Sequence, residues 1–120
     1  MMIKTDCDLF FEGTRVAKII SFTFETPWAS GQVKFIDAAF HQKLINITTY
    51  VMYDVEVEAR ELPEAEEDAL LEAKLAELNL VWEDTALQKD GKWAIETADG
   101  DRRPIFAVRF ETDGFIDFRL

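Results

Sequence analysis

The fold is decided by the middle of the chain, residues 37–79, which read DAAFHQKLINITTYVMYDVEVEARELPEAEEDALLEAKLAELN. The second part of this stretch consists mainly of Ala, Leu, Glu and Lys and contains no β-branched residue, a composition typical of a helix. Its apolar side chains follow the spacing of a buried helical stripe, at Leu71, Leu75, Leu78 and Trp82. Pro63 suits the first helical position and Asn79 suits a left-handed stop, so we predict a helix over about 63–79.

The first part of the stretch has two interpretations. Asp37 is a suitable helix N-cap, and an apolar stripe at helical spacing runs through Phe40, Leu44, Ile47, Val51 and Val55. The end of this segment also alternates as a strand would, and its many β-branched residues favour a strand. Because the helical stripe covers the whole segment, we predict a helix over about 38–59, with a strand at 44–59 as the open alternative.

Both flanking thirds of the chain alternate apolar and polar residues, as strands covered on one face do. The positions predicted to point inward are Phe11, Ile20, Phe22, Phe24, Val33, Phe35, Trp93, Ile95, Phe106, Val108, Phe110, Ile116 and Phe118. A turn is predicted at Glu12-Gly13-Thr14 and a break at 27–31, and two-residue hairpin turns are predicted at Asp90-Gly91, Asp99-Gly100 and Asp113-Gly114.

These patterns predict a single α+β domain over residues 1–120. We expect one antiparallel, mostly meander sheet of about six strands, with both helices packed on one face and the order βββ-αα-βββ.

Negative charge is concentrated in one part of the sequence. Between Asp54 and Asp84 there are twelve acidic and two basic residues, whereas the rest of the chain has twelve acids and eleven bases. Such a field repels phosphates and anionic lipids, so we expect neither a nucleic-acid nor a membrane partner. A single cysteine, no long apolar run and no signal-peptide pattern predict a cytoplasmic protein.

No motif in the sequence points to catalysis. His41 is the only histidine, and Cys7 lies between two aspartates that oppose a reactive thiolate, so structural roles are favoured over a Cys7–His41 pair. The sequence Asp99-Gly100-Asp101 lacks the ligand spacing of a calcium loop and fits a hairpin turn. Carboxylate pairs in the acidic stretch share one solvated environment, which does not suit acid–base work. We therefore predict no enzymatic activity, no cofactor and no metal.

Five residues are candidates for binding a partner: Glu64, Glu66, Glu67, Asp68 and Trp28. The first four form an acidic helical face that would meet a basic protein partner, with electrostatic steering of the encounter. Trp28 follows Pro27 in a predicted loop. Its side chain either anchors a partner or folds back to cap the end of the sheet, and the second role is favoured. Arg102 and Arg103 either hold an anionic group or only counter the acidic helix.

The favoured hypothesis is a non-enzymatic protein-interaction module of inhibitor or immunity type. One alternative is a small-molecule-binding domain with a site between helices and sheet, whose polar groups would be Tyr50, Tyr53, His41 and Arg109. Another alternative is a homo-oligomeric structural protein, joined through the sheet face that carries Ile105, Ala107 and Phe115.

Overall fold

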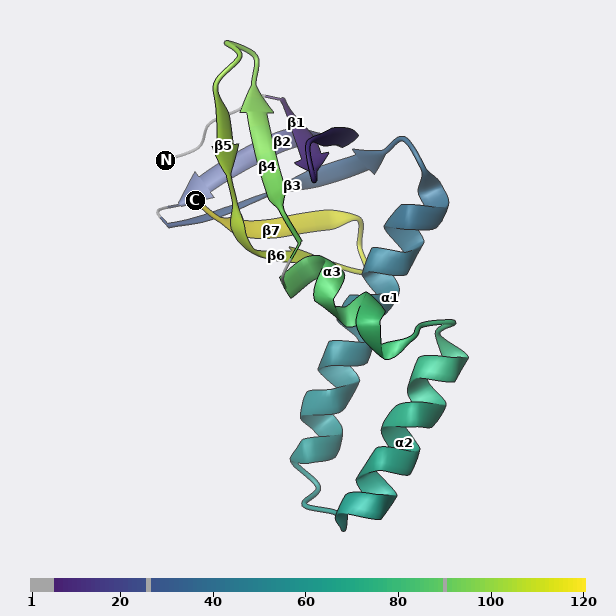
Figure 1. Ribbon diagram of the computed structural model, residues 1–120. Coiled ribbons are helices and arrows are strands. Elements are labelled where there is room, and N and C mark those ends of the chain that lie inside the picture. The colour runs from purple at the N-terminus through teal and green to yellow at the C-terminus, as the bar shows by residue number, and fades with distance from the viewer. Residues whose placement is uncertain (1–5, 26, 90) are drawn as a thin grey trace.

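The strands predicted at both ends of the chain form one antiparallel sheet in the computed structural model, which confirms the α+β class (Figure 1). The structure describes residues 6–25, 27–89 and 91–120, without the side chains of residues 21, 22, 24 and 25. The strands are β1 (Cys7–Phe11), β2 (Thr14–Glu25), β3 (Trp28–Phe35), β4 (Trp93–Thr97), β5 (Arg102–Pro104), β6 (Phe106–Phe110) and β7 (Phe115–Arg119). Their order across the sheet is β5-β4-β1-β2-β3-β7-β6.

The sheet curls until its two edges are joined by continuous chain. β5 and β6 occupy opposite edges of the sheet, yet only Ile105 separates them in the sequence. Ile105 is buried, and its backbone N–H donates to the carbonyl of Trp93 at 3.0 Å. Counting β5 and β6 as one interrupted strand recovers the predicted number of strands. The predicted meander is only partly correct, because β4 pairs with β1 and β7 pairs with β3.

Both predicted long helices are present, as α1 (Ala38–Glu58) and α2 (Glu64–Glu77), and the strand alternative for 44–59 is wrong. The carboxylate of Asp37 caps α1 by accepting the backbone N–H of Ala39 at 2.9 Å. Asn79 has a φ of 55°, which confirms the predicted left-handed stop after α2. Two short elements were not predicted: the 3-10 helix η1 (Trp82–Thr85) and the single-turn helix α3 (Ala86–Lys89).

Aromatic rings fill the inside of the curled sheet. The Trp93 ring lies 4.6 Å from Phe11 and 5.1 Å from Phe110, measured between centroids. From the first turn of α1, Phe40 reaches the same cluster and meets Phe35 edge-on at 5.8 Å. The beginning of α1 therefore closes this part of the core.

One predicted inward position of β6 is wrong because the strand contains a bulge. Phe106 is 57% exposed, whereas its neighbour Ile105 is buried. The pairing of β6 with β7 shifts between Phe106 and Arg109, and Ala107 between them has a φ of 52°. An extra residue in one strand reverses which side chains face inward.

A second pairing shift explains the error in β2. Ile19 is fully buried and Ile20 only partly, and the register against β3 shifts between Ile20 and Thr23. The predicted positions Phe22 and Phe24 lie outside the described side chains. The other predicted inward residues are buried or partly buried: Phe11, Val33, Phe35, Trp93, Ile95, Val108, Phe110, Ile116 and Phe118.

The predicted turns have mixed outcomes. Glu12 and Gly13 have φ values of 49° and 82°, so the two-residue hairpin geometry occurs here and not at Asp99-Gly100 or Asp113-Gly114. At 99–100 and 113–114 only the glycine has a positive φ, although both pairs do join strands. The pair at 90–91 was predicted as a hairpin; Asp90 lies outside the described residues, and Gly91 follows α3 instead of a strand.

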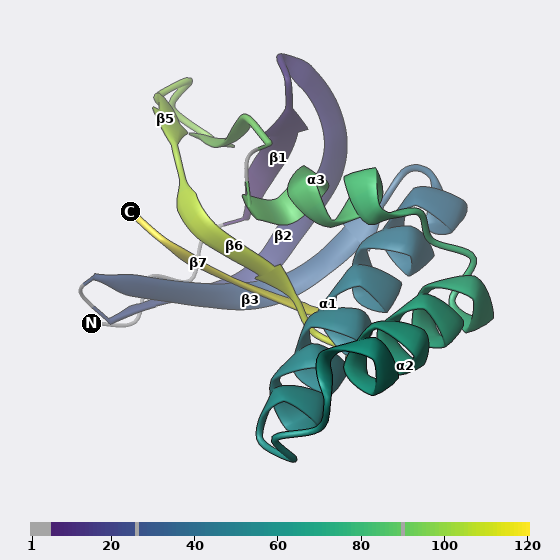
Figure 2. The same ribbon diagram turned by 60° about the horizontal axis from the view of Figure 1, so that its bottom comes forward.

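The two long helices do not both lie on the sheet, as was predicted. The beginning of α1 packs against the sheet, with Leu44 and Ile47 buried, whereas its end and α2 extend away side by side (Figures 1 and 2). We call residues 51–79 the arm. The arm makes the molecule long, with extents of 52 × 28 × 22 Å, and among its residues only Val57 is buried. Within the described part of the chain, no helix has the length and apolarity to cross a membrane.

Candidate interaction site

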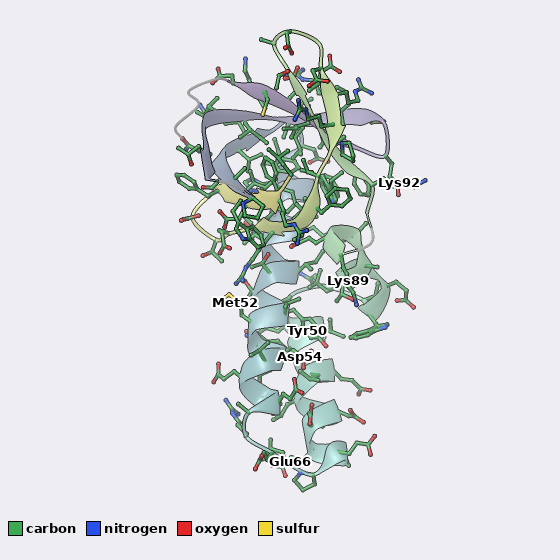
Figure 3. All side chains as sticks on the ribbon, turned by 90° about the vertical axis from the view of Figure 1, so that its left-hand side faces the viewer. Tyr50, Met52, Asp54, Glu66, Lys89 and Lys92 are labelled. Carbon is green, nitrogen blue, oxygen red and sulfur yellow. The ribbon has the colours of Figure 1, made fainter. Side chains whose placement is uncertain are left out.

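The four predicted acidic residues lie together at the free end of the arm. Glu64, Glu66, Glu67 and Asp68 form the beginning of α2, and Figure 3 shows Glu66 at the end farthest from the sheet. No ion pair among the described residues involves any of the four. Acids at a helix N-terminus are worth about 0.3–1 kcal/mol each, and this effect fades within the first turn. Helix stability therefore accounts for only part of this acidic group, which we call the tip.

The two basic residues of the acidic stretch are already paired within the arm. Arg60 contacts the carboxylate of Glu56 at 2.9 Å, and Lys74 contacts that of Glu77 at 3.3 Å. Lys74 also lies over the ring of Tyr53, 5.0 Å from its centroid. Because twelve acids face only two bases between positions 54 and 84, the arm and its base carry a large unbalanced negative charge.

Trp28 does not lie near the tip. It is the first residue of β3, beside the β2–β3 connection at the other end of the molecule, so the predicted break at 27–31 is largely strand (Figure 1). Its side chain is 51% exposed and lines a groove of about 580 Å³ with Arg109, Glu111 and Asp117. Burial, together with a hydrogen bond to Asp117, raises the pKa of Glu111. The structure therefore separates Trp28 from the four acids predicted to act with it.

A larger groove lies at the base of the arm, where α1, the η1–α3 segment and β6 meet. Its volume is about 790 Å³. Three parts of the fold contribute residues to its lining: Ile47, Thr48, Tyr50, Val51 and Asp54 come from α1, Trp82, Glu83, Gln88 and Lys89 from η1 and α3, and Ala107 and Arg109 from β6. We call this depression the base groove.

Hydrogen bonds fix the η1–α3 wall of the base groove to α1. The Gln88 side chain donates to the Leu44 carbonyl at 2.6 Å and to the Thr48 hydroxyl at 3.1 Å. Asp84 accepts the backbone N–H of Val81 at 2.9 Å and pairs with Lys43 at 2.9 Å. Burial alone would raise the pKa of Asp84, but these two partners lower it overall. The wall is therefore held in place without a ligand.

Comparison with known protein families, curated proteins and solved structures finds no match to this chain.

Apolar side chains of the base groove are exposed to solvent. Trp82 is 64% exposed and Val51 is 49% exposed, while Val55, one turn further along α1, is 64% exposed. These three residues were predicted to continue buried stripes, which is wrong. A helix of 21 residues is about 31 Å long, and α1 leaves the sheet before its stripe ends. Trp82 lies beyond the left-handed stop at Asn79, and this stop was the signal in the sequence that it is not part of α2.

Two of the four polar residues predicted for a small-molecule site line the base groove. Tyr50 is 2% exposed, and burial together with the Asp54 carboxylate raises its pKa. Figure 3 shows Tyr50 and Asp54 on one side of α1, Met52 on the other, and Lys89 nearer the sheet. Arg109 of β6 is the second residue of the predicted set in the groove.

The other two residues of that set lie elsewhere. His41 stacks on Phe35 with centroids 4.6 Å apart, and Tyr53 faces Lys74 within the arm. Burial lowers the pKa of His41, and its buried Nε2 has no hydrogen-bond partner among the described residues. His41 is therefore a half-buried ring that packs against Phe35 and Phe110.

The remaining chemical candidates are engaged within the sheet. Burial, followed by the charges of Asp8 and Asp6, raises the pKa of Cys7 to about 11, which opposes a nucleophilic role. Arg102 contacts Glu96 at 2.8 Å, and Arg103 contacts Asp101 at 2.8 Å. Among the described residues, no three His, Cys, Asp or Glu side chains are grouped to hold a metal ion.

Proposed function

We propose that the protein is a non-enzymatic interaction module, of inhibitor or immunity type, which binds a basic surface of a partner protein through its acidic arm. The observation that carries this proposal is the position of the negative charge: it lies on an arm that extends away from the sheet (Figure 1). A partner reaches this surface without contacting the folded core.

The charge distribution also supports steering of a partner toward the arm. The rest of the chain has nearly equal numbers of acids and bases, so the field of the protein is dominated by residues 54–84. Complementary charge raises association rates, and screening by salt reduces this effect. Binding through the arm is therefore expected to weaken as the ionic strength rises.

The test compares two variants with the same change in charge. The tip variant carries Glu64→Gln, Glu66→Gln, Glu67→Gln and Asp68→Asn, whereas the control carries Asp6→Asn, Asp8→Asn, Glu12→Gln and Asp101→Asn on the sheet. Each protein is used as bait in lysate of the source organism, and captured proteins are quantified at low and high salt. We expect the tip variant to lose a salt-sensitive basic protein that the wild type and the control retain.

Equal capture by the wild type and the tip variant would show that the acidic arm is not the binding surface. Equal losses in both variants would show that net charge alone matters, which also contradicts the proposal.

A small-molecule site in the base groove is the second candidate function. Tyr50 and Arg109 support it, since both line the groove as that hypothesis requires.

The third candidate function is a homo-oligomer joined through one face of the sheet. Ile105 is buried and therefore cannot belong to this face, while Ala107, Phe115 and Phe106 are exposed on the described surface. Sedimentation velocity would detect such an oligomer. We also propose a cytoplasmic location, because the single Cys7 can form no internal disulfide.

A further inference from the structure

We infer that the base groove is the docking site for an amphipathic helix of the partner, with an apolar face flanked by Lys and Arg side chains. This inference rests on the proposed function and names the element that the basic partner would contribute. Three features carry it: the apolar anchors, the open shape and the distribution of charge around the groove.

The anchors lie on two facing walls. Val51 and Val55 lie four residues apart on one face of α1 and are both exposed, whereas Ile47, one turn earlier in the same row, is buried and belongs to the core. Trp82 lies on the opposite wall, in η1. An amphipathic helix presents apolar side chains at the same intervals and commonly binds in a groove lined in this way. A half-exposed Trp is the type of residue that dominates such interfaces.

The open shape favours a macromolecular segment over a small ligand. Small-molecule sites bury most of the ligand surface. In the base groove, Trp82 and Val51 keep about half or more of their surface exposed to solvent. A helix laid along α1 would cover both side chains and also reach Val55.

The negative charge of the arm, which continues from the groove, favours a basic occupant and disfavours a second copy of this chain. Asp54 and Glu83 lie on the walls of the groove, which continues into the acidic arm. A second copy has a formal net charge of −11 and would be repelled. Lys89 and Arg109 also line the groove, but Arg109 is paired with Glu111 at 2.9 Å. Lys89, on the sheet side in Figure 3, would suit the C-terminal carbonyl groups of a bound helix.

The experiment uses the full chain and a fluorescein-labelled helical peptide composed of Leu and Lys, with Leu on one face. Binding is followed by fluorescence anisotropy. Trp82→Ala and Val51→Ser are expected to weaken binding by more than about 10-fold, as loss of an interface anchor does. Trp28→Ala is the matched control, because Trp28 is also an exposed tryptophan but lies on the sheet; it should change affinity less than about 2-fold, as expected outside an interface. Both groove side chains are exposed, so circular dichroism should show each variant folded.

A second peptide, with Ser in place of Leu and the same number of Lys residues, separates the two proposals. If it binds as tightly as the Leu peptide, charge alone drives binding; the groove inference fails and the acidic-arm proposal stands. If the tip variant binds the Leu peptide normally while Trp82→Ala does not, the groove binds without the tip and the acidic-arm proposal fails. If the Leu peptide does not bind but the uncharged fluorescent probe N-phenyl-1-naphthylamine does, and Trp82→Ala abolishes this, the groove is a small-molecule site and the inference is wrong.

Discussion

The curled sheet and the arm are held together in different ways. The sheet encloses a large apolar core that includes Leu9, Ile19, Phe110 and Phe118, none of which is exposed. The arm buries one residue, Val57, and carries most of the unbalanced charge of the chain. Apolar burial is the main favourable term in folding, so the sheet supplies stability and the arm supplies accessible surface.

The arm is attached to the rest of the molecule through the continuous helix α1 and through contacts at its base. Leu71, Leu75 and Leu78 pack against the edge of the core, and the Asn46 side chain donates to the carbonyl of Leu78 at 3.3 Å. Regions with few buried apolar contacts open more readily than a protein core. The comparison therefore predicts that the arm opens locally while the sheet remains folded, and the following predictions test this difference.

The largest effect is expected inside the sheet. Phe110→Ala should destabilise the whole protein by about 3–5 kcal/mol, since it removes a fully buried ring that packs against Trp93 and Phe35. Urea unfolding followed by circular dichroism measures this. Phe115→Ala is the control, because Phe115 is exposed on β7, and it should cost less than about 0.5 kcal/mol. Similar costs for both variants would contradict the assigned core.

A smaller and local effect is expected in the arm. Val57→Ala should cost about 1–2 kcal/mol, because it removes buried methyl groups outside the main core cluster. Hydrogen exchange should then become faster at amides of residues 51–79 and stay unchanged in the strands. Val55→Ala, at an exposed position of the same helix, is the control. Faster exchange throughout the sheet would show that arm and sheet unfold as one unit.

The stability contributed by Asp84, at the junction of the two regions, should depend on pH. Its pKa is lowered from the ordinary 3.8, so its contribution to stability is full above that value and is lost as the pH falls through the lower folded pKa. Asp84→Asn should cost about 1 kcal/mol at pH 7 and less in strong acid. Thermal melts from pH 7 to about pH 2 would show the two proteins converging. A constant difference over this range would rule out the Lys43 and Val81 contacts as its source.

The last prediction concerns chemical reactivity and involves no change in stability. The pKa of Cys7, raised from 9.0 to about 11, lowers the thiolate fraction at pH 8 by about 100-fold. Native protein should react with iodoacetamide at least that much more slowly than protein unfolded in urea. Rapid alkylation of the native protein would contradict the burial of Cys7 in β1.

Local signals in the sequence were sufficient to predict the two long helices, although they missed η1 and α3. Asp37 and Asn79 mark helix ends through their own side chains and backbone preferences, and both were identified correctly. The bulges in β2 and β6 were missed. Ala107, which lies in the second bulge, is an ordinary residue type in the sequence, and nothing there marks it as an extra residue in the strand. The same limit led to the wrong assignment of Phe106 to the core.

The candidate site was found only in part. The acids of the tip were identified from charge alone, and their common location at the beginning of α2 follows from their closeness in the sequence. Trp82 was predicted to belong to a buried stripe and Val51 to the apolar stripe of the first helix, yet both are exposed. A periodic stripe shows which residues are apolar but not how far the neighbouring elements cover them. How far the sheet extends along α1 depends on pairings between strands that are distant in the sequence. Local periodicity carries no information about such pairings.

The pairing of strands from opposite ends of the chain affects the order in which the molecule folds. β1 pairs with β4 and β3 pairs with β7, so both halves of the sheet require strands from opposite ends of the chain. Contacts of this kind form slowly, whereas two helices joined by a short turn need only local contacts. During synthesis the arm would therefore be complete before the sheet, and β3 would present an open edge until β7 is made. Early negative charge on the arm would keep such a nascent chain apart from its copies.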